Sequence, residues 1–152
     1  MAEQASQIRQ ILAEHKSEPP NILKALLAVQ ARIGHVPPGA AEDMAQALGV
    51  TPAQLAGVLS YYPDLRQCAP GRHVIRVCQG ESCFANGCTR VLREFQDRLR
   101  MKAVDASAGE RFTLETMSCA GNCAVAPTVI IDGDLYGRVV SSQIAALLER
   151  YK

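Results

Sequence analysis

Four cysteines in the second half of the chain form two closely spaced pairs. The pairs are Cys78 with Cys83, separated by four residues, and Cys119 with Cys123, separated by three. Each pair directly follows an apolar run whose alternation predicts a strand, over residues 73–78 and 111–118. If these strands lie side by side, their ends bring the four sulfur atoms together. Four thiolates are the ligands of a zinc site or of an iron–sulfur cluster.

The spacing of the cysteines favours a two-iron cluster over zinc. Structural zinc sites favour two residues between cysteines, and neither pair has that spacing. A separation of four is typical of plant-type two-iron ferredoxins. Gly80, Gly121 and Asn122 lie in the two loops, and small residues let backbone N–H groups approach the sulfur atoms. Dithiol–disulfide chemistry needs a two-residue separation, and buried free thiols explain one or two cysteines but not two pairs.

Two further cysteines complicate the choice of ligands. Cys83 and Cys88 are also separated by four residues. Cys88 follows Gly87 at the predicted start of a helix, which would point its thiol away from a loop site, so we interpret it as a free thiol near the site. Cys68 lies outside both predicted strands and is interpreted as a free thiol as well. The histidines have no partners in sequence and are assigned no catalytic role.

The spacing of apolar residues in the first part of the chain predicts four short helices. They are expected over residues 4–16, 22–33, 40–48 and 52–62. Asn21 and Thr51 are the expected N-caps of the second and fourth helix. These helices hold no cysteine and no cluster of catalytic residue types. We therefore interpret residues 1–68 as a helical packing or docking segment.

Residues 64–72 lose this periodicity, and strands and helices then alternate through residues 69–152. The expected elements are strands over 73–78, 111–118 and 128–132, a loop over 80–86, a helix over 87–100, a turn over 105–110, a Gly133-Asp134 hairpin leading into 135–138, and a last helix capped by Ser141 or Ser142. The predicted fold class is α+β, with an N-terminal helical bundle followed by an α/β domain.

Composition excludes several kinds of partner. Sixteen basic and fifteen acidic residues nearly balance, and tryptophan is absent, so nucleic acid is not an expected partner. The sequence contains no apolar run long enough to span a bilayer and no signal peptide at its N-terminus, so a cytoplasmic location without membrane insertion is expected. Neither a G-x-G-x-x-G nor a P-loop motif is present to bind nicotinamide or flavin.

The cysteine loops resemble those of the thioredoxin-like [2Fe-2S] ferredoxin family. The resemblance rests on Cys78 and Cys83 after an apolar strand, on Gly87, and on the run from Cys119 to Cys123 followed by Pro127. Residues 57–62 and 70–74 also resemble the members that are subunits of larger enzymes, so the resemblance covers about residues 20–150. Two departures are visible: Ala120 where leucine is common, and the extra thiol of Cys88.

The resemblance implies that Cys78, Cys83, Cys119 and Cys123 ligate a [2Fe-2S] cluster in a thioredoxin-like domain over about residues 70–152. It also implies a partner subunit that holds FMN, a four-iron cluster and the NAD(H) site, and on which residues 1–65 dock. The expected function is one-electron transfer, without an active site on this chain.

The short length and residues 70–73 favour the gamma subunit of an NAD-dependent formate dehydrogenase as the parent. The equivalent subunit of complex I (NADH:quinone oxidoreductase) or of an NAD-reducing hydrogenase is the alternative. A stand-alone ferredoxin and a zinc-stabilised interaction module remain open as alternatives of another class. Arg72, Arg76 or Arg90 would raise the cluster potential if close to it, although ordinary surface charge also explains them.

Overall fold

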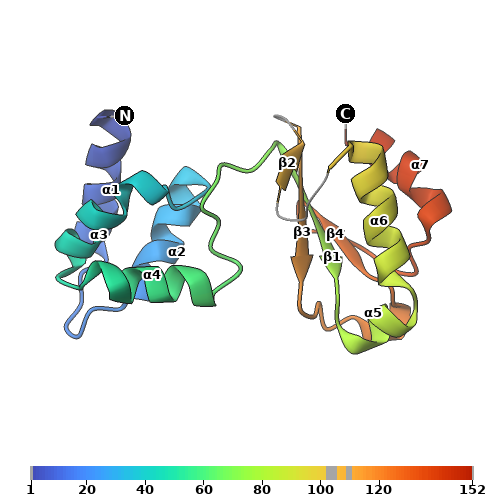
Figure 1. Cartoon of the computed structure of the whole chain (residues 1–152), viewed down its shortest axis with the longest axis horizontal. Helices are drawn as coiled ribbons and strands as arrows, with labels where there is room; N and C mark the ends of the chain where they lie inside the picture. Colours follow the sequence, from blue (N-terminus) through green and yellow to red (C-terminus); the bar gives the residue numbers. More distant parts are fainter. Residues whose placement is uncertain (1, 102–105, 109–110, 152) are drawn as a thin grey trace. The chain divides into compact units, whose positions relative to one another are not determined.

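The computed structural model describes residues 2–101, 106–108 and 111–151. The chain divides into two compact units, Met1–Ala69 and Pro70–Lys152 (Figure 1). Each unit has a hydrophobic core of its own. In the described part of the chain, no helix has both the length and the apolar character that a bilayer crossing requires.

The first unit is built from four helices, as the sequence predicts. They are α1 (Ala2–Glu14), α2 (Ile22–Ile33), α3 (Ala41–Leu48) and α4 (Pro52–Tyr61), with a 3-10 turn at Pro38–Ala40 before α3. The Asn21 side chain accepts the N–H of Lys24 at 3.0 Å and so caps α2. Thr51 and Gln54 form a reciprocal capping box at the start of α4. Both predicted caps are therefore confirmed.

The helices of the first unit enclose an apolar core. Its fully buried side chains include Ile11, Leu26, Met44 and Leu55, one from each helix. The Gln30 carboxamide fastens the segment that follows α4 to this core: Nε2 donates to the Asp64 carbonyl at 2.7 Å, and Oε1 accepts the Arg66 N–H at 2.6 Å. The first unit therefore has its own apolar core, and two hydrogen bonds hold the segment after α4 against it.

The second unit is a five-stranded mixed sheet with helices packed on it. Its strands are β1 (His73–Cys78), β2 (Ala106–Ala108), β3 (Phe112–Met117), β4 (Val129–Ile131) and β5 (Asp134–Tyr136), in the order β2-β3-β1-β4-β5. β1 and β3 run parallel, and the other pairs are antiparallel. Helix α6 (Cys88–Leu99) packs on β1 and β3 and contacts α7 (Ile144–Glu149), as Figure 1 shows. The α+β prediction is confirmed.

Four local predictions for this unit are wrong in detail. Neither Ser141 nor Ser142 caps the last helix, because both lie in a 3-10 turn, Ser141–Gln143, and α7 follows it without a side-chain cap. The loop expected over residues 80–86 contains a short helix, α5 (Glu81–Ala85), which begins when the Phe84 N–H donates to the Gly80 carbonyl at 2.9 Å. One helical turn is too short to show an apolar period. Part of the turn expected over 105–110 is strand β2, and its residues 105 and 109–110 lie outside the described residues.

The hairpin between β4 and β5 is shifted by one residue from the prediction. Ile131 pairs with Asp134, so the two-residue loop is Asp132-Gly133. Both loop residues have positive φ, 51° and 99°, which a tight hairpin of this kind requires. The sequence offers Asp-Gly and Gly-Asp side by side, and the strand register decides between them.

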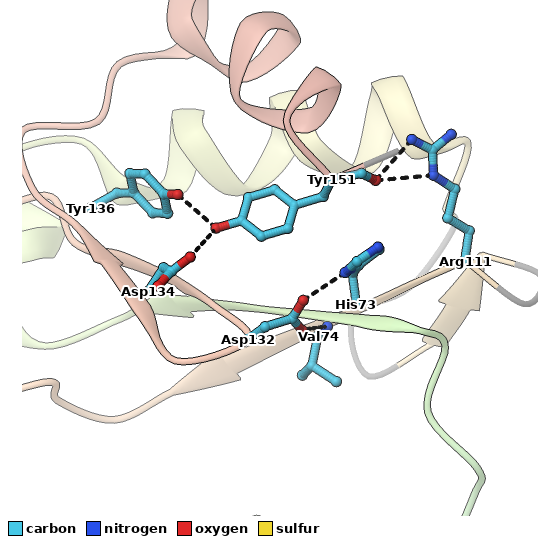
Figure 2. A network of polar contacts seen from close by, with 7 residues as sticks. All are labelled: His73, Val74, Arg111, Asp132, Asp134, Tyr136 and Tyr151. Carbon is cyan, nitrogen blue, oxygen red and sulfur yellow. Dashed lines mark hydrogen bonds and ion pairs between the residues drawn. The ribbon is translucent and has the colours of Figure 1, made fainter.

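The C-terminal residues are fastened near the start of β1, at the end of that strand away from Cys78. Figure 2 shows the Tyr151 side chain reaching toward β5, where its hydroxyl donates to Asp134 Oδ2 at 2.9 Å and accepts from the Tyr136 hydroxyl at 2.6 Å. The Arg111 guanidinium donates to the Tyr151 carbonyl at 2.9 Å. Burial, the hydrogen bond with Tyr136 and the Asp134 carboxylate raise the pKa of Tyr151 far above its usual value.

Candidate metal centre

The two cysteine loops leave the sheet at one edge. Cys78 pairs with Met117 at the last register position of the parallel strands β1 and β3, so both chains emerge side by side. The Gln79 N–H donates to the Met117 carbonyl at 2.8 Å, which extends the pairing one step past β1. On the other side of β1, the Cys78 N–H donates to the Thr128 carbonyl at 3.0 Å. The sheet thus fixes the backbone at the root of the first loop.

The second loop folds around its own first sulfur atom. Gly121 has φ 73°, a backbone conformation that favours glycine, and its N–H donates to Cys119 Sγ at 3.4 Å. Cys123 begins a 3-10 turn, Cys123–Val125. The Ser82 hydroxyl of α5 donates to the Cys123 carbonyl at 3.3 Å and so joins the two loops.

The four cysteines predicted as ligands lie near one another, and a chain of pairwise contacts connects all four. Cys78 interacts with Cys83 and with Cys119, and Cys119 interacts with Cys123. Cys78 and Cys83 are each 2% exposed, whereas Cys119 and Cys123 are exposed. One pair therefore faces the core of the domain and the other faces solvent. Within the residues that the structure describes, no three metal-binding side chains surround a single point.

The surroundings change the acidity of these thiols in different directions. Burial opposes ionisation of Cys78, but donation from the Gly80 and Ala120 backbones and from the neighbouring thiols prevails and lowers its pKa. Burial raises the pKa of Cys83, partly offset by hydrogen bonds from Thr128. The charge of Cys119 raises the pKa of Cys123. The arrangement thus favours a thiolate at Cys78 and favours the protonated thiol at Cys83 and Cys123.

Two glycines beside the loops are closely approached by neighbouring atoms, so that a side chain would be crowded at Gly80 and would clash at Gly137. A Cβ atom on Gly80 would lie 3.1 Å from the Ser118 carbonyl oxygen and 3.4 Å from Cys119 Sγ. A Cβ atom on Gly137 would lie 2.6 Å from Val125 Cγ2. The next residue, Arg138, donates its N–H to the Val125 carbonyl at 2.7 Å. The segment after β5 therefore supports the turn that carries Cys123.

Cys88 lies directly behind the first loop and is fully buried. Its Sγ donates to Gln79 Oε1 at 3.6 Å, and burial raises the pKa of the Cys88 thiol. The other end of the same carboxamide, Gln79 Nε2, is buried and has no hydrogen-bond partner among the described residues. An unsatisfied buried donor costs roughly 1–3 kcal/mol. Sulfur atoms of a cluster accept hydrogen bonds, so this orphaned donor fits an iron–sulfur group at the site.

The remaining candidates lie elsewhere or have other partners. Cys68 is exposed and belongs to the first unit. His73 Nδ1 lies 2.6 Å from Asp132 Oδ2, at the start of β1 and not at its cysteine end. Arg76 forms an ion pair with Glu115 at 3.2 Å. The guanidinium of Arg90 lies over Gly87, where a Cβ atom would be 3.0 Å from it.

Sequence reasoning missed three residues at the site. Gln79 and Thr128 contribute hydrogen-bonding groups, and Gly137 contributes close approach. Gln79 is adjacent to a cysteine, and that position was the only signal available for it in the sequence. Thr128 and Gly137 reach the site only because β4 and β5 fold back on the sheet.

Comparison with known proteins agrees with the geometry of the cysteine loops. The model of the thioredoxin-like [2Fe-2S] ferredoxin family matches residues 8–152. A subunit of the NADH-quinone oxidoreductase from Pseudomonas aeruginosa is 37% identical over 129 residues, which cover 85% of this chain and 78% of that protein. The HndA subunit of the NADP-reducing hydrogenase from Solidesulfovibrio fructosivorans is 30% identical over 131 residues, with 86% and 77% coverage.

Among solved structures, an NAD+-reducing [NiFe]-hydrogenase in the air-oxidised state has the same fold. The TM-score is 0.68 at 22% sequence identity, over 87% of this chain. The match spans only 23% of the hydrogenase chain. The family match confirms the resemblance seen in the sequence, the thioredoxin-like fold that it implies, and [2Fe-2S] as the cofactor of the family.

Proposed function

Because the chain belongs to the thioredoxin-like [2Fe-2S] ferredoxin family, we propose that it is the electron-transfer subunit of an NAD(H)-linked oxidoreductase. Cys78, Cys83, Cys119 and Cys123 hold the cluster in this proposal. The observation that carries it is the meeting of both cysteine pairs at one edge of the sheet, where β1 and β3 end in register. A [2Fe-2S] cluster takes four cysteine ligands, two for each iron.

Different residues of this chain would contribute to binding the [2Fe-2S] cluster in different ways. The buried pair, Cys78 and Cys83, excludes water from one side, and the exposed pair opens the other side to an electron-transfer partner. Backbone N–H groups at Gly80, Ala120 and Gly121 donate toward sulfur and stabilise negative charge there. When bound, the cluster supplies a carrier that accepts and releases one electron. These donors and the exposure of the loops then set its potential.

The parent enzyme in this proposal is of the quinone-linked or hydrogenase type. The sequence favours the gamma subunit of a formate dehydrogenase, whereas the relatives reported above are NADH-quinone oxidoreductase and hydrogenase subunits and support the alternative. The partner would hold FMN, a four-iron cluster and the NAD(H) site. Residues 1–65 would dock on it, and the 78% exposed Tyr61 of α4 is a suitable contact. A cytoplasmic location agrees with six free cysteines.

The first test is the metal content of anaerobically purified protein. We expect about two irons and two acid-labile sulfides per chain, and an EPR signal from a half-spin state after dithionite reduction. Cys119→Ala should abolish the visible spectrum, and Cys68→Ala, an exposed thiol of the first unit, is the matched control. Zinc without iron would support the interaction-module alternative, and an intact spectrum in Cys119→Ala would refute the proposed ligands.

The second test concerns the partner. The tagged holoprotein should co-purify with a subunit that contains FMN and a four-iron cluster and that oxidises NADH. Deletion of residues 1–65 should abolish this co-purification while the cluster spectrum persists, since the second unit has its own core. A holoprotein that transfers electrons but elutes alone would favour the stand-alone ferredoxin.

A further inference from the structure

A hydrogen-bonded pair, Cys88 and Gln79, lies immediately behind the first cysteine loop. Cys88 is the first residue of α6 and is 0% exposed, and it also interacts electrostatically with Cys78. Gln79 follows Cys78, and its backbone N–H is already bonded to the Met117 carbonyl at 2.8 Å. The backbone of Gln79 is therefore fixed by the sheet.

The two ends of the Gln79 carboxamide have different chemistry and different surroundings. Oε1 accepts the thiol proton of Cys88 over an Oε1–Sγ distance of 3.6 Å. This contact leaves the amide N–H groups at the opposite end, where Nε2 is buried and unpartnered within the described residues. A buried N–H donor needs an acceptor. No carboxylate or carbonyl among the described residues accepts a hydrogen bond from Gln79 Nε2. An anionic sulfur site beside Cys78 would accept one.

We propose that the Gln79 amide donates a hydrogen bond to a sulfur atom of the cluster, and that the Cys88 thiol is the positioning residue that orients it. This inference rests on the proposed function, because the acceptor is the cluster or one of its thiolates. In this inference Cys88 orients Gln79 and is not a cluster ligand, because its thiol donates its proton to Gln79 Oε1.

The orientation of the amide determines the sign of the effect. A donor that points at sulfur stabilises the reduced cluster, which carries one more negative charge than the oxidised cluster. With the amide reversed, Oε1 would face the anionic site and destabilise it. The Cys88 thiol prevents that reversal because it offers a proton and so selects the oxygen end. Loss of the amide should therefore make reduction less favourable.

The test is the reduction potential of the full-length holoprotein, measured by EPR-monitored titration. Gln79→Met keeps the length of the side chain and removes its donor, and we expect the reduction equilibrium constant to fall about tenfold, which is about 59 mV for one electron. Gln96→Met is the matched control. Gln96 is half-buried, as Gln79 is, but it lies on α6 about two turns beyond Cys88 and so away from the cysteine loops. An unchanged potential in Gln79→Met would overturn the inference.

Variants of Cys88 separate positioning from ligation. Cys88→Ala should keep two irons per chain and shift the potential in the same direction as Gln79→Met, because the amide loses its orienting partner. Cys88→Ser retains a hydroxyl donor and should restore most of the wild-type potential. Loss of iron in Cys88→Ala, with retention in Gln79→Met, would show that Cys88 is a ligand and would refute its assigned role.

A measurement on the unaltered protein covers the case in which a variant fails to take up the cluster. With 15N placed selectively in glutamine side chains, pulsed EPR of the reduced protein should detect a 15N coupling from one side-chain amide. A reduced cluster without such a coupling would refute the inference and leave the proposed function standing. Absence of a two-iron signal from the wild-type protein would instead refute the proposed function.

Discussion

Replacement of Gly137 by alanine tests whether the segment after β5 holds the second cysteine loop in place. The added Cβ atom would lie 2.6 Å from Val125 Cγ2, 2.8 Å from Val125 Cβ and 3.0 Å from its carbonyl oxygen. Three contacts with one residue leave no single rotamer change that relieves them, and the β-branched Val125 has little rotamer freedom. Gly137 has no positive φ, so the backbone itself accepts alanine. The expected effect is therefore steric.

The size of the effect follows from the missing space. The closest contact is about 0.8 Å short of ordinary van der Waals distance, and overpacking of this kind costs about 1–3 kcal/mol of unfolding free energy. Val125 must move, and it lies in the same 3-10 turn as Cys123. Metal–ligand distances tolerate only about 0.2 Å, so we expect the affinity for the cluster to fall roughly tenfold or more.

Two measurements check this prediction. Urea unfolding of the cluster-free protein, followed by NMR signals of the second unit, should show the lower stability. The decay of visible circular dichroism in the presence of a chelator should show faster cluster loss. Gly57→Ala is the control: Gly57 lies inside α4 with nothing within 4 Å, so alanine should stabilise the first unit by roughly 0.5–1 kcal/mol and leave the cluster unchanged. Equal cluster lifetimes in Gly137→Ala and wild type would refute the reasoning.

Three further outcomes are expected. Thr51→Ala removes the cap of α4 and should lower the unfolding free energy of the first unit by about 1 kcal/mol, with Thr51→Ser close to wild type in urea titrations. The raised pKa of Tyr151 means that the folded state keeps this proton longer than the unfolded state, so stability present below about pH 10 is lost as the pH rises further. Tyr151→Phe should show a shallower loss in alkaline thermal scans, and equal slopes would contradict this account. In cluster-free protein, iodoacetamide should alkylate the exposed Cys68 and Cys119 before the buried Cys88, as peptide mass spectrometry would show; early labelling of Cys88 would contradict its burial.

Elements with strong local signals could be predicted from the sequence. The Asn21 and Thr51 caps and the apolar spacing of four helices gave the first unit to within one or two residues. The alternating runs gave β1 and β3, because these strands are bounded by clear changes of pattern. Capping and periodicity act over a few residues, so they are legible without knowledge of the fold.

Elements that depend on neighbours distant in sequence could not be predicted in the same way. Helix α5 is one turn long, and β2 has three residues that pair with β3. The hairpin loop was displaced by one residue, because only pairing of Ile131 with Asp134 selects the register. Such features are set by tertiary contacts, which override weak local preferences.

The candidate site shows the same division. The pattern of cysteines and strands predicted that the two pairs would leave neighbouring strands, and the ligand set that it suggests stays a prediction. It did not predict that Cys78 and Cys83 are buried while the other pair is exposed. Nor could it predict the contact of Gly137 with Val125, which are brought together by the β4–β5 hairpin. Spacing specifies chemistry, whereas burial and close approach require the folded chain.

The second unit separates its cluster chemistry from the contacts that fasten its C-terminal residues. The cysteine loops begin at Cys78, and the Tyr151 network lies by His73 at the other end of β1 (Figure 2). Five strand steps of about 3.3 Å place these regions roughly 17 Å apart. Effects at sites this far apart usually add. Tyr151→Phe should therefore destabilise the domain without changing the cluster potential, and Gln79→Met should change the potential to the same extent in both backgrounds. A potential shift that depends on residue 151 would show that the two ends of the strand are coupled.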